Sequence, residues 1–189
     1  MLGWNELQQA CASCTRCGLC EKRNKVVFGV GNPNADVMFV GEGPGENEDL
    51  QGEPFVGSAG KQLDEMRCII DLDRKMNCYI ANIVKCRPPN NRDPHESEQE
   101  ACIDFLRNQV ALIKPKVIVC LGRIAARRLI DPEFRITKEH GTFVEKNGVW
   151  MTAIYHPSAL LRDDHKRPAT FVDLLAIRDK LRELGADVR

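Results

Sequence analysis

The sequence lacks an excess of either charge and any apolar run long enough to cross a bilayer. Lys and Arg number 27 and Asp and Glu number 27, so the formal net charge is zero. The chain therefore has no general field that attracts nucleic acid, and any DNA contact must come from a local basic patch. The opening segment MLGWNELQQACASC has no basic region followed by an apolar core, so no signal peptide is expected. These absences predict a cytoplasmic protein.

The sequence also lacks internal repeats and low-complexity linkers, and its 189 residues suit one domain covering 1–189. Short Val- and Ile-rich runs alternate with helical patterns. Runs without polar alternation are typical of strands buried on both faces of a parallel sheet. The pattern predicts an α/β layered fold, with strands expected at 36–40, 77–84, 116–121 and 149–155 and helices at 60–70, 94–113, 122–130 and 169–184.

Each predicted strand ends in a conspicuous loop. In chain order these loops contain GEGPG, KCRPPNNRDP, LGR and HPSALLR. Ligands of open α/β sheets bind beyond the carboxyl ends of the strands. The four loops are therefore expected to converge on one pocket.

The glycine-rich loop after the first strand stands where a phosphate-binding loop would stand. The segment VGEGPGENEDLQGEPFVGSAGKQL has neither the Gly-Lys-Ser/Thr ending nor the GxGxxG fingerprint. Four of its carboxylates would repel a polyphosphate; they are Glu42, Glu46, Glu48 and Asp49. The loop is better suited to a neutral ligand that forms hydrogen bonds.

Cysteine is abundant, with nine residues, and in a cytoplasmic chain this count does not favour a disulfide framework. The segment 11–20 holds a C-x2-C-x2-C-x2-C run, a strong signal for zinc or iron–sulfur. One possibility is a site made only of this run. The other takes two of its cysteines and adds Cys86 and Cys102, and the spacing alone leaves both open.

Several motifs taken together resemble the family 4 uracil-DNA glycosylases, which belong to the uracil-DNA glycosylase superfamily. The resemblance is carried by GEGPGENEDLQGEPFVGSAG, YIANIVKCRPPNNRDP, the cysteine in EQEACIDF, and HPSALLR. It runs in order from about Cys14 to Leu184. It implies a three-layer α/β/α sandwich with a central four-stranded parallel sheet. It also implies a 4Fe–4S cluster bound by Cys14, Cys17, Cys86 and Cys102.

The resemblance assigns the glycine loop to a uracil pocket, which an enzyme needs when it extrudes a base from the DNA stack. It implies that the Gly43 N–H meets a uracil carbonyl and that Phe55 stacks on the base. Asn82 would recognise the uracil edge, and its burial would be costly without such partners. Without the resemblance, Phe55 would be interpreted as a core residue and Asn82 equally well as a loop cap.

The same resemblance assigns roles to three more residues, of which two are catalytic and one shapes the pocket. His156 would hydrogen-bond uracil O2, where negative charge grows as the glycosidic bond breaks. Glu42 would orient water or stabilise an oxocarbenium-like sugar. Glu48 would shape the pocket and exclude bases larger at C5. The superfamily's best-known motif has an aspartate where this chain has Gly43.

DNA contacts are expected from the same pocket edge. Leu160 or Leu161 is a candidate wedge that fills the gap in the base stack, and Arg162 is a candidate phosphate contact. Arg87 belongs to a basic group flanking the second loop, although such groups are often only solvated surface. A monomer acting on single- or double-stranded uracil-containing DNA, with no membrane partner, is expected.

The predicted function is hydrolysis of the N-glycosidic bond of deoxyuridine in DNA, which releases uracil and leaves an abasic site. A competing hypothesis is a covalent uracil-DNA-binding protein, because a related branch traps the sugar with a histidine near the position of His140. The long basic insert of that branch is not present between Phe134 and Phe143. Two further hypotheses are a small iron–sulfur electron carrier and an inactive DNA-binding relative.

Overall fold

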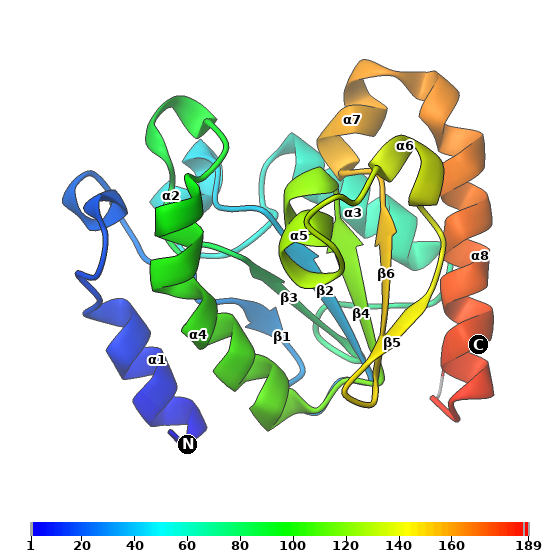
Figure 1. The fold of residues 1–189 in the computed structure, drawn as a ribbon, viewed down its shortest axis with the longest axis horizontal. Helices are drawn as coiled ribbons and strands as arrows, with labels where there is room; N and C mark the ends of the chain where they lie inside the picture. The colour runs from blue at the N-terminus through cyan, green and yellow to red at the C-terminus, as the bar shows by residue number, and fades with distance from the viewer. Residues whose placement is uncertain (1, 187, 189) are drawn as a thin grey trace.

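The structure is a computed structural model that describes residues 2–186 and 188. Its centre is a sheet with strand order β1-β3-β2-β4-β6-β5 (Figure 1). The four inner strands are parallel, and β1 and β5 pair antiparallel at the two edges. The strands are β1 Val30–Gly31, β2 Val37–Gly41, β3 Cys78–Asn82, β4 Val117–Leu121, β5 Val144–Lys146 and β6 Val149–Ile154.

Helices cover both faces of the sheet and surround one of its ends. The α-helices are α1 Trp4–Ala12, α2 Glu46–Gln51, α3 Ser58–Cys68, α4 Glu96–Ile113, α5 Arg123–Leu129, α6 Ile136–Glu139, α7 Pro157–Arg162 and α8 Arg167–Glu183. Short 3-10 turns lie at Gly18–Glu21, Pro89–Asn91 and Asp164–Lys166. No helix in the described part of the chain has the length and apolar content that a bilayer crossing requires.

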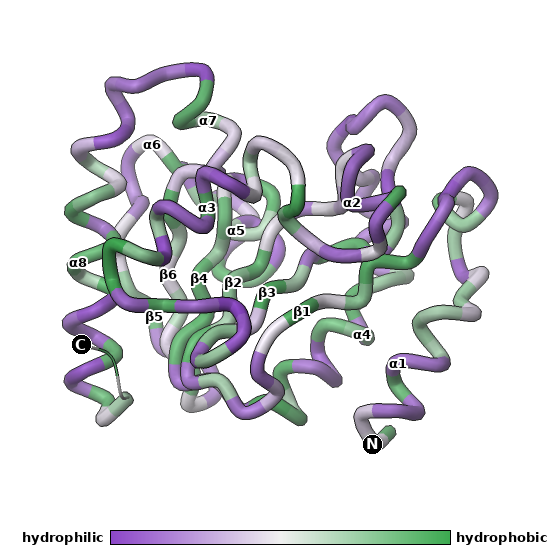
Figure 2. Tube along the Cα trace, turned by 180° about the vertical axis from the view of Figure 1, so that it is seen from behind, coloured by the Kyte–Doolittle hydropathy of each residue, from purple (hydrophilic) through white to green (hydrophobic). Residues whose placement is uncertain are grey.

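The sheet separates two apolar cores, because successive side chains of a strand point to opposite faces. In β2, Met38 and Val40 join the core under α1, α4 and α5, whereas Val37 and Phe39 join the core under α3, α7 and α8. All five residues of β2 are buried, which explains the continuous apolar run in the sequence. Figure 2 shows these apolar strands in the middle of the molecule, with hydrophilic turns outside.

The predicted three-layer sandwich around four parallel strands is confirmed. The structure adds β1 and β5, which were not predicted because β1 has two residues and β5 is exposed throughout, so neither carries a burial pattern. The four predicted helices are present at 58–68, 96–113, 123–129 and 167–183. The carboxyl ends of the inner strands meet at one end of the sheet, where Gly41 of β2 lies in register with Asn82 of β3.

We expect Phe39→Ala to lower the free energy of unfolding by about 3–5 kcal/mol, because it leaves a cavity in the centre of the sheet. Phe39 is 0% exposed. Urea unfolding followed by circular dichroism would measure the change. Phe171→Ala is the matched control, because Phe171 on α8 is 47% exposed and its loss should change stability by no more than about 0.5 kcal/mol. Equal losses in the two variants would contradict this account of the core.

Candidate active site

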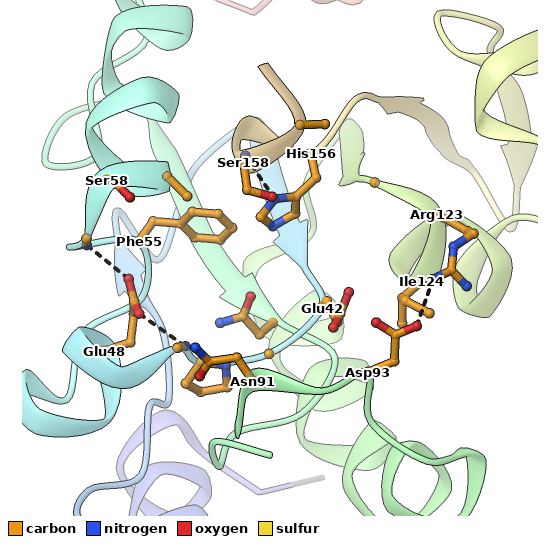
Figure 3. Close-up of a pocket in the computed structure, with 18 of the residues that line it drawn as sticks. Glu42, Glu48, Phe55, Ser58, Asn91, Asp93, Arg123, Ile124, His156 and Ser158 are labelled. Atoms are coloured by element: carbon orange, nitrogen blue, oxygen red, sulfur yellow. Dashed lines mark hydrogen bonds and ion pairs between the residues drawn. The ribbon is translucent and has the colours of Figure 1, made fainter. Parts of the chain in front are cut away.

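A pocket of about 710 Å³ lies at the carboxyl end of the parallel strands. All four loops singled out in the sequence contribute to it, together with the start of α3. Figure 3 shows side chains from these separate segments pointing into one space. The predicted convergence of the loops is therefore observed, and Glu42, Gly43, Glu48, Phe55, Asn82, His156 and Arg162 all line the pocket.

Asn82 is the last residue of β3 and its side chain is almost completely enclosed. It is 2% exposed, and its Oδ1 has no hydrogen-bond partner within the part of the chain that the structure describes. A Cβ on neighbouring Gly41 would lie only 2.5 Å from this oxygen. Leaving a buried polar atom unpaired costs about 1–3 kcal/mol, so the arrangement calls for a donor from a ligand.

Phe55 holds its ring in the pocket through an unusual backbone conformation. Its φ is 54°, in the left-handed region that a bulky residue seldom adopts. Arg74 Nη2 donates to the Phe55 carbonyl at 2.9 Å, and a Cβ on Gly60 would lie 2.0 Å from the same oxygen. The Phe55 and His156 rings have centroids 5.7 Å apart. Strain of this kind is typical of binding sites.

His156 follows β6 and is the N-cap of α7. The Ser158 backbone N–H donates to His156 Nδ1 at 3.2 Å, and Ser158 Oγ lies 2.8 Å from the same nitrogen. Because Nδ1 accepts, the neutral ring carries its proton on Nε2. Burial lowers the pKa of His156 to about 4, and the positive charge of Arg162 acts in the same direction, against the opposing effect of Glu48. His156 is thus a neutral N–H donor at neutral pH.

Glu42 directly follows β2, and its carboxyl is half-buried in the pocket. Burial raises the pKa of Glu42 to about 7, and the nearby carboxyl of Asp93 acts in the same direction, whereas Arg123 lowers the pKa. A carboxyl that titrates near neutral pH suits general acid–base chemistry.

Glu48 ties two pocket loops together. Its Oε2 accepts from the Gly45 N–H at 3.1 Å, and its Oε1 accepts from the N–H groups of Val56 and Gly57 at 3.0 Å each. These bonds join the GEGPG loop to the segment that carries Phe55 (Figure 3). Gly43 lies in the same loop, where a Cβ would meet Val84 Cγ2 at 2.7 Å.

The predicted DNA-contacting residues differ in how accessible they are. Leu160 is 2% exposed and packs in the core under α8, which argues against it as a wedge. Leu161 is 48% exposed and is free to reach a ligand. Arg162 lines the pocket. Arg87 donates through Nε to Asn91 Oδ1 at 2.8 Å and lies 3.7 Å from Glu46, so it is partly engaged within the protein.

Six cysteines from three segments line one small pocket between α1, the 3-10 turn at Gly18–Glu21 and α4. They are Cys11, Cys14, Cys17, Cys20, Cys86 and Cys102. In the described part of the chain, no three potential ligands are arranged around a single metal ion. The remaining cysteines lie elsewhere: Cys120 and Cys78 are buried in strands, whereas Cys68 is exposed.

Positive groups and N–H donors face these sulfurs. The Lys85 N–H donates to Cys102 Sγ at 3.3 Å, and Arg23 Nη1 donates to Cys86 Sγ at 3.5 Å. Burial raises the pKa of Cys86 to about 11 and also raises that of Cys102, so both are thiols unless something displaces their protons. Metal binding displaces such protons and leaves thiolates, which these donors would stabilise.

Lys85 places a positive charge beside the same cysteines. Its side chain is fully buried, and Nζ donates to Gln109 Oε1 at 2.7 Å. Gln109 Nε2 in turn donates to the carbonyl of Phe28 and to Tyr79 Oη. Burial lowers the pKa of Lys85 to about 8, while negative charge on Cys102 and Cys11 raises it. A buried ammonium is costly without an anion nearby, and thiolates would supply one.

His140 is held by a partner outside the pocket. Its Nδ1 lies 2.7 Å from Asp173 Oδ2 of α8, and its ring centroid lies 4.8 Å from that of Tyr155. Tyr155 lines the pocket, whereas His140 does not. The structure thus gives His140 a local anchoring partner.

The chain is similar to known proteins over most of its length. The family model described as Uracil DNA glycosylase superfamily matches residues 28–177. The type-4 uracil-DNA glycosylase of Archaeoglobus fulgidus is 52% identical over 157 residues, which cover 79% of this chain and 78% of the relative. That of Sulfurisphaera tokodaii is 41% identical over 92% of this chain and 83% of its own length. That of Thermotoga maritima is 46% identical over 79% of each chain.

Four residues that act on the predicted site residues were not predicted from the sequence. Ser158 fixes the His156 tautomer, Asp93 and Arg123 act on Glu42, and Arg74 holds the Phe55 backbone. Ser158 had a signal, because a serine two residues after the histidine can bond back to it. The others come from segments distant in the sequence and carry no local pattern.

We expect the imidazole of His156 to titrate with a midpoint at about pH 4 in the folded protein. In the unfolded chain it should titrate at about 6.5. Ring ¹⁵N chemical shifts would report both the midpoint and the tautomer, with Nδ1 unprotonated above the midpoint. Ser158→Ala should weaken the tautomer preference, because it removes one of two donors to Nδ1. A folded-state midpoint near 6.5, or a proton on Nδ1, would contradict the assignment.

Proposed function

The chain belongs to the uracil DNA glycosylase superfamily, and from this premise we propose how its pocket removes uracil from DNA. The reaction is hydrolysis of the N-glycosidic bond of deoxyuridine, a DNA-repair step that releases uracil and leaves an abasic site. An enzyme that works on a base inside DNA must bring that base out of the stack. The pocket at the end of the parallel sheet receives it.

Asn82 is the observation that carries this proposal. Its Oδ1 is buried and unpaired among the described residues, so it needs a donor from the ligand. Uracil supplies one as N3–H, and the Asn82 amide would donate in return to uracil O4. Cytosine has no hydrogen on N3 and would leave the oxygen unpaired, which costs about 1–3 kcal/mol. This contact accounts for selection of uracil over cytosine.

Phe55 and the glycine loop supply the flat surfaces of the site. Stacking on an aromatic ring contributes about 1–3 kcal/mol per base. The Phe55 ring is held from its backbone side by Arg74, which supports a stacking role. Gly43 lets its loop approach the base closely and offers its N–H to a uracil carbonyl. Glu48 shapes the pocket by joining the two loops through three backbone N–H groups.

His156 assists departure of the base. As the C1′–N1 bond breaks, its electron pair moves to uracil and negative charge develops on O2. The neutral imidazole with its proton on Nε2 donates a hydrogen bond to that oxygen. Removal of such a donor typically lowers the rate by about 10²–10³.

Glu42 acts on the sugar side in its ionised form. A water molecule attacks C1′ as the bond to N1 breaks, and one water proton passes to the Glu42 carboxylate. The same negative charge stabilises an oxocarbenium-like sugar. Because its pKa is about 7, a substantial fraction of Glu42 is ionised at neutral pH.

DNA contact is assigned to the rim of the pocket. Leu161 is the proposed wedge, since it is exposed where Leu160 is buried. Arg162 is a proposed phosphate contact, and Arg87 becomes one if it leaves Asn91 and Glu46. The preference between single- and double-stranded DNA, the monomeric state, the cytoplasmic location and the one-domain organisation over 1–189 stay predictions.

We further propose that the cysteine pocket holds a 4Fe–4S cluster bound by Cys14, Cys17, Cys86 and Cys102. The shared pocket and the donors from Lys85 and Arg23 support this assignment. A multi-iron cluster spreads its ligands more widely than a single ion, so the lack of a single-ion site in the described residues does not conflict with it. When bound, the cluster would cross-link the N-terminal segment, the loop after β3 and α4.

We expect purified protein to release uracil from a labelled oligonucleotide, in single strand and opposite guanine, but to leave thymine intact. Alkali treatment and a denaturing gel would reveal the abasic site. Asn82→Ala should slow excision by about a hundredfold or more, because the uracil edge loses its partner. Asn108→Ala is the matched control, since Asn108 is a partly buried residue on α4 that does not line the pocket.

A heat-stable shifted band would indicate covalent trapping and would redirect attention to His140. Intact uracil DNA from iron-loaded protein would overturn the glycosylase proposal and would favour an electron carrier or an inactive DNA-binding protein.

We expect Cys86→Ala and Cys102→Ala to lose iron and visible absorbance, because each removes a proposed cluster ligand. Cys120→Ala is the control, since Cys120 is also buried but lies in β4, outside the cysteine pocket. Cys20→Ala should keep its iron if Cys20 is surplus. Iron analysis per protein chain would measure all four variants, and iron loss in Cys20→Ala would reassign the ligands.

A further inference from the structure

Two charged side chains at the pocket wall form an ion pair next to Glu42. Asp93 lies in the loop between β3 and α4, and Arg123 is the first residue of α5. Arg123 Nη2 lies 2.7 Å from Asp93 Oδ2. Figure 3 shows the pair on the same side of the pocket as Glu42. Both residues line the pocket.

The ion pair contributes little to the stability of the fold. The side chain of Arg123 is 45% exposed and that of Asp93 is 56% exposed. Ion pairs this open to solvent typically contribute about 0–1 kcal/mol. Variants at either position should therefore fold. The two residues lie beside the half-buried carboxyl of Glu42, which points to a role in the site and not in stability.

Figure 3 shows the carboxyls of Asp93 and Glu42 turned toward each other, and, after burial, the negative charge of Asp93 raises the pKa of Glu42. Two carboxylates this close repel each other, so one proton shared between them is favoured. Glu42 is the more buried of the two, so the proton is favoured on Glu42. Arg123 neutralises part of the Asp93 charge and weakens this arrangement.

We propose that Asp93 and Arg123 are positioning residues that act through Glu42. Asp93 holds the protonated Glu42 carboxyl in place, and Arg123 opposes Asp93 and so favours the ionised carboxylate that the sugar requires. The inference rests on the proposed role of Glu42 in uracil excision. It assigns the control of Glu42 ionisation to the loop after β3 and to the first residue of α5.

The charged surroundings of Glu42 support this division of roles. Asp93 from the loop after β3 and Arg123 from α5 are the two charged groups that act on its ionisation. His156, from the end of β6, is uncharged above about pH 5 because its pKa is about 4. The other charged residues lining the pocket are Glu46, Glu48, Arg92, Arg162 and Lys166.

The inference predicts opposite pH effects for two variants. The rate should rise with pH as Glu42 ionises, with a midpoint at about 7 in the unchanged protein. Asp93→Asn removes the like charge and should lower this midpoint by about one pH unit. At pH 6 the variant should then be about fivefold faster than the unchanged protein. Arg123→Gln should raise the midpoint by about one unit and be about fivefold slower at pH 7.

The experiment is single-turnover uracil release with enzyme in excess, between pH 5 and 9. Asp36→Asn is the matched control, since Asp36 forms a similar 3.1 Å pair with Lys116 at the opposite end of the sheet. Its profile should match that of the unchanged protein. Near pH 9 all four proteins should converge, because Glu42 is then ionised in each.

Unmoved midpoints, or shifts in the same direction, would overturn the inference. A pH-independent loss in Arg123→Gln would also overturn it and identify a simple DNA contact. If the unchanged protein released no uracil at any pH, the proposed function itself would fail. The ¹³C shift of the Glu42 carboxyl, measured without DNA, gives the same midpoints independently of activity, and unchanged values in both variants would reject the inference on their own.

Discussion

The pocket depends on how closely β2 and β3 approach each other at their carboxyl ends. Gly41 and Asn82 are paired in register there. A Cβ at position 41 would lie 2.5 Å from Asn82 Oδ1 and 2.6 Å from Phe55 Cζ. No side chain can occupy that space without moving the recognition amide, the stacking ring or both. The hydrogen-bonded register of the sheet thus fixes how closely the recognition amide and the stacking ring approach position 41.

Burial then gives each polar group of the pocket its chemical character. The same loss of solvent keeps His156 neutral and Glu42 partly protonated near neutral pH. Glu48 lies a few residues away, but three backbone N–H groups occupy its carboxylate. Carboxylates of one acidic loop therefore have different roles, and their hydrogen-bond partners distinguish them. The division agrees with a general rule for acid–base sites, in which environment separates chemically identical groups.

Much of the fold could be predicted from the sequence because its signals are local. Continuous apolar runs indicated the parallel strands, and helical spacing indicated the long helices. The antiparallel edges could not be predicted, since β1 is too short and β5 too exposed to show a pattern. The pocket was predictable because the ends of parallel strands must meet. The pairing of Asp93 with Arg123 was not, because the two residues are 30 positions apart and only the tertiary fold brings them together.

The choice between Leu160 and Leu161 shows a second limit. The two residues are neighbours of identical chemistry, so only the orientation of α7 against the sheet decides that one is buried and the other exposed. The cysteines show a third limit. Their spacing indicated a metal site, but six of them share one pocket and geometry alone does not reduce the number to four.

The left-handed backbone at Phe55 has a thermodynamic consequence for substrate capture. A ring on a flexible loop would lose rotational freedom when a base stacked on it, and that loss would subtract from affinity by about 0.5–1.5 kcal/mol. In the folded protein Arg74, held in turn by Asp64, fixes the carbonyl of Phe55. The conformational entropy of this segment is therefore lost on folding and not on DNA binding. An extruded base therefore meets a preorganised platform, and the stacking energy is available to offset the cost of leaving the duplex.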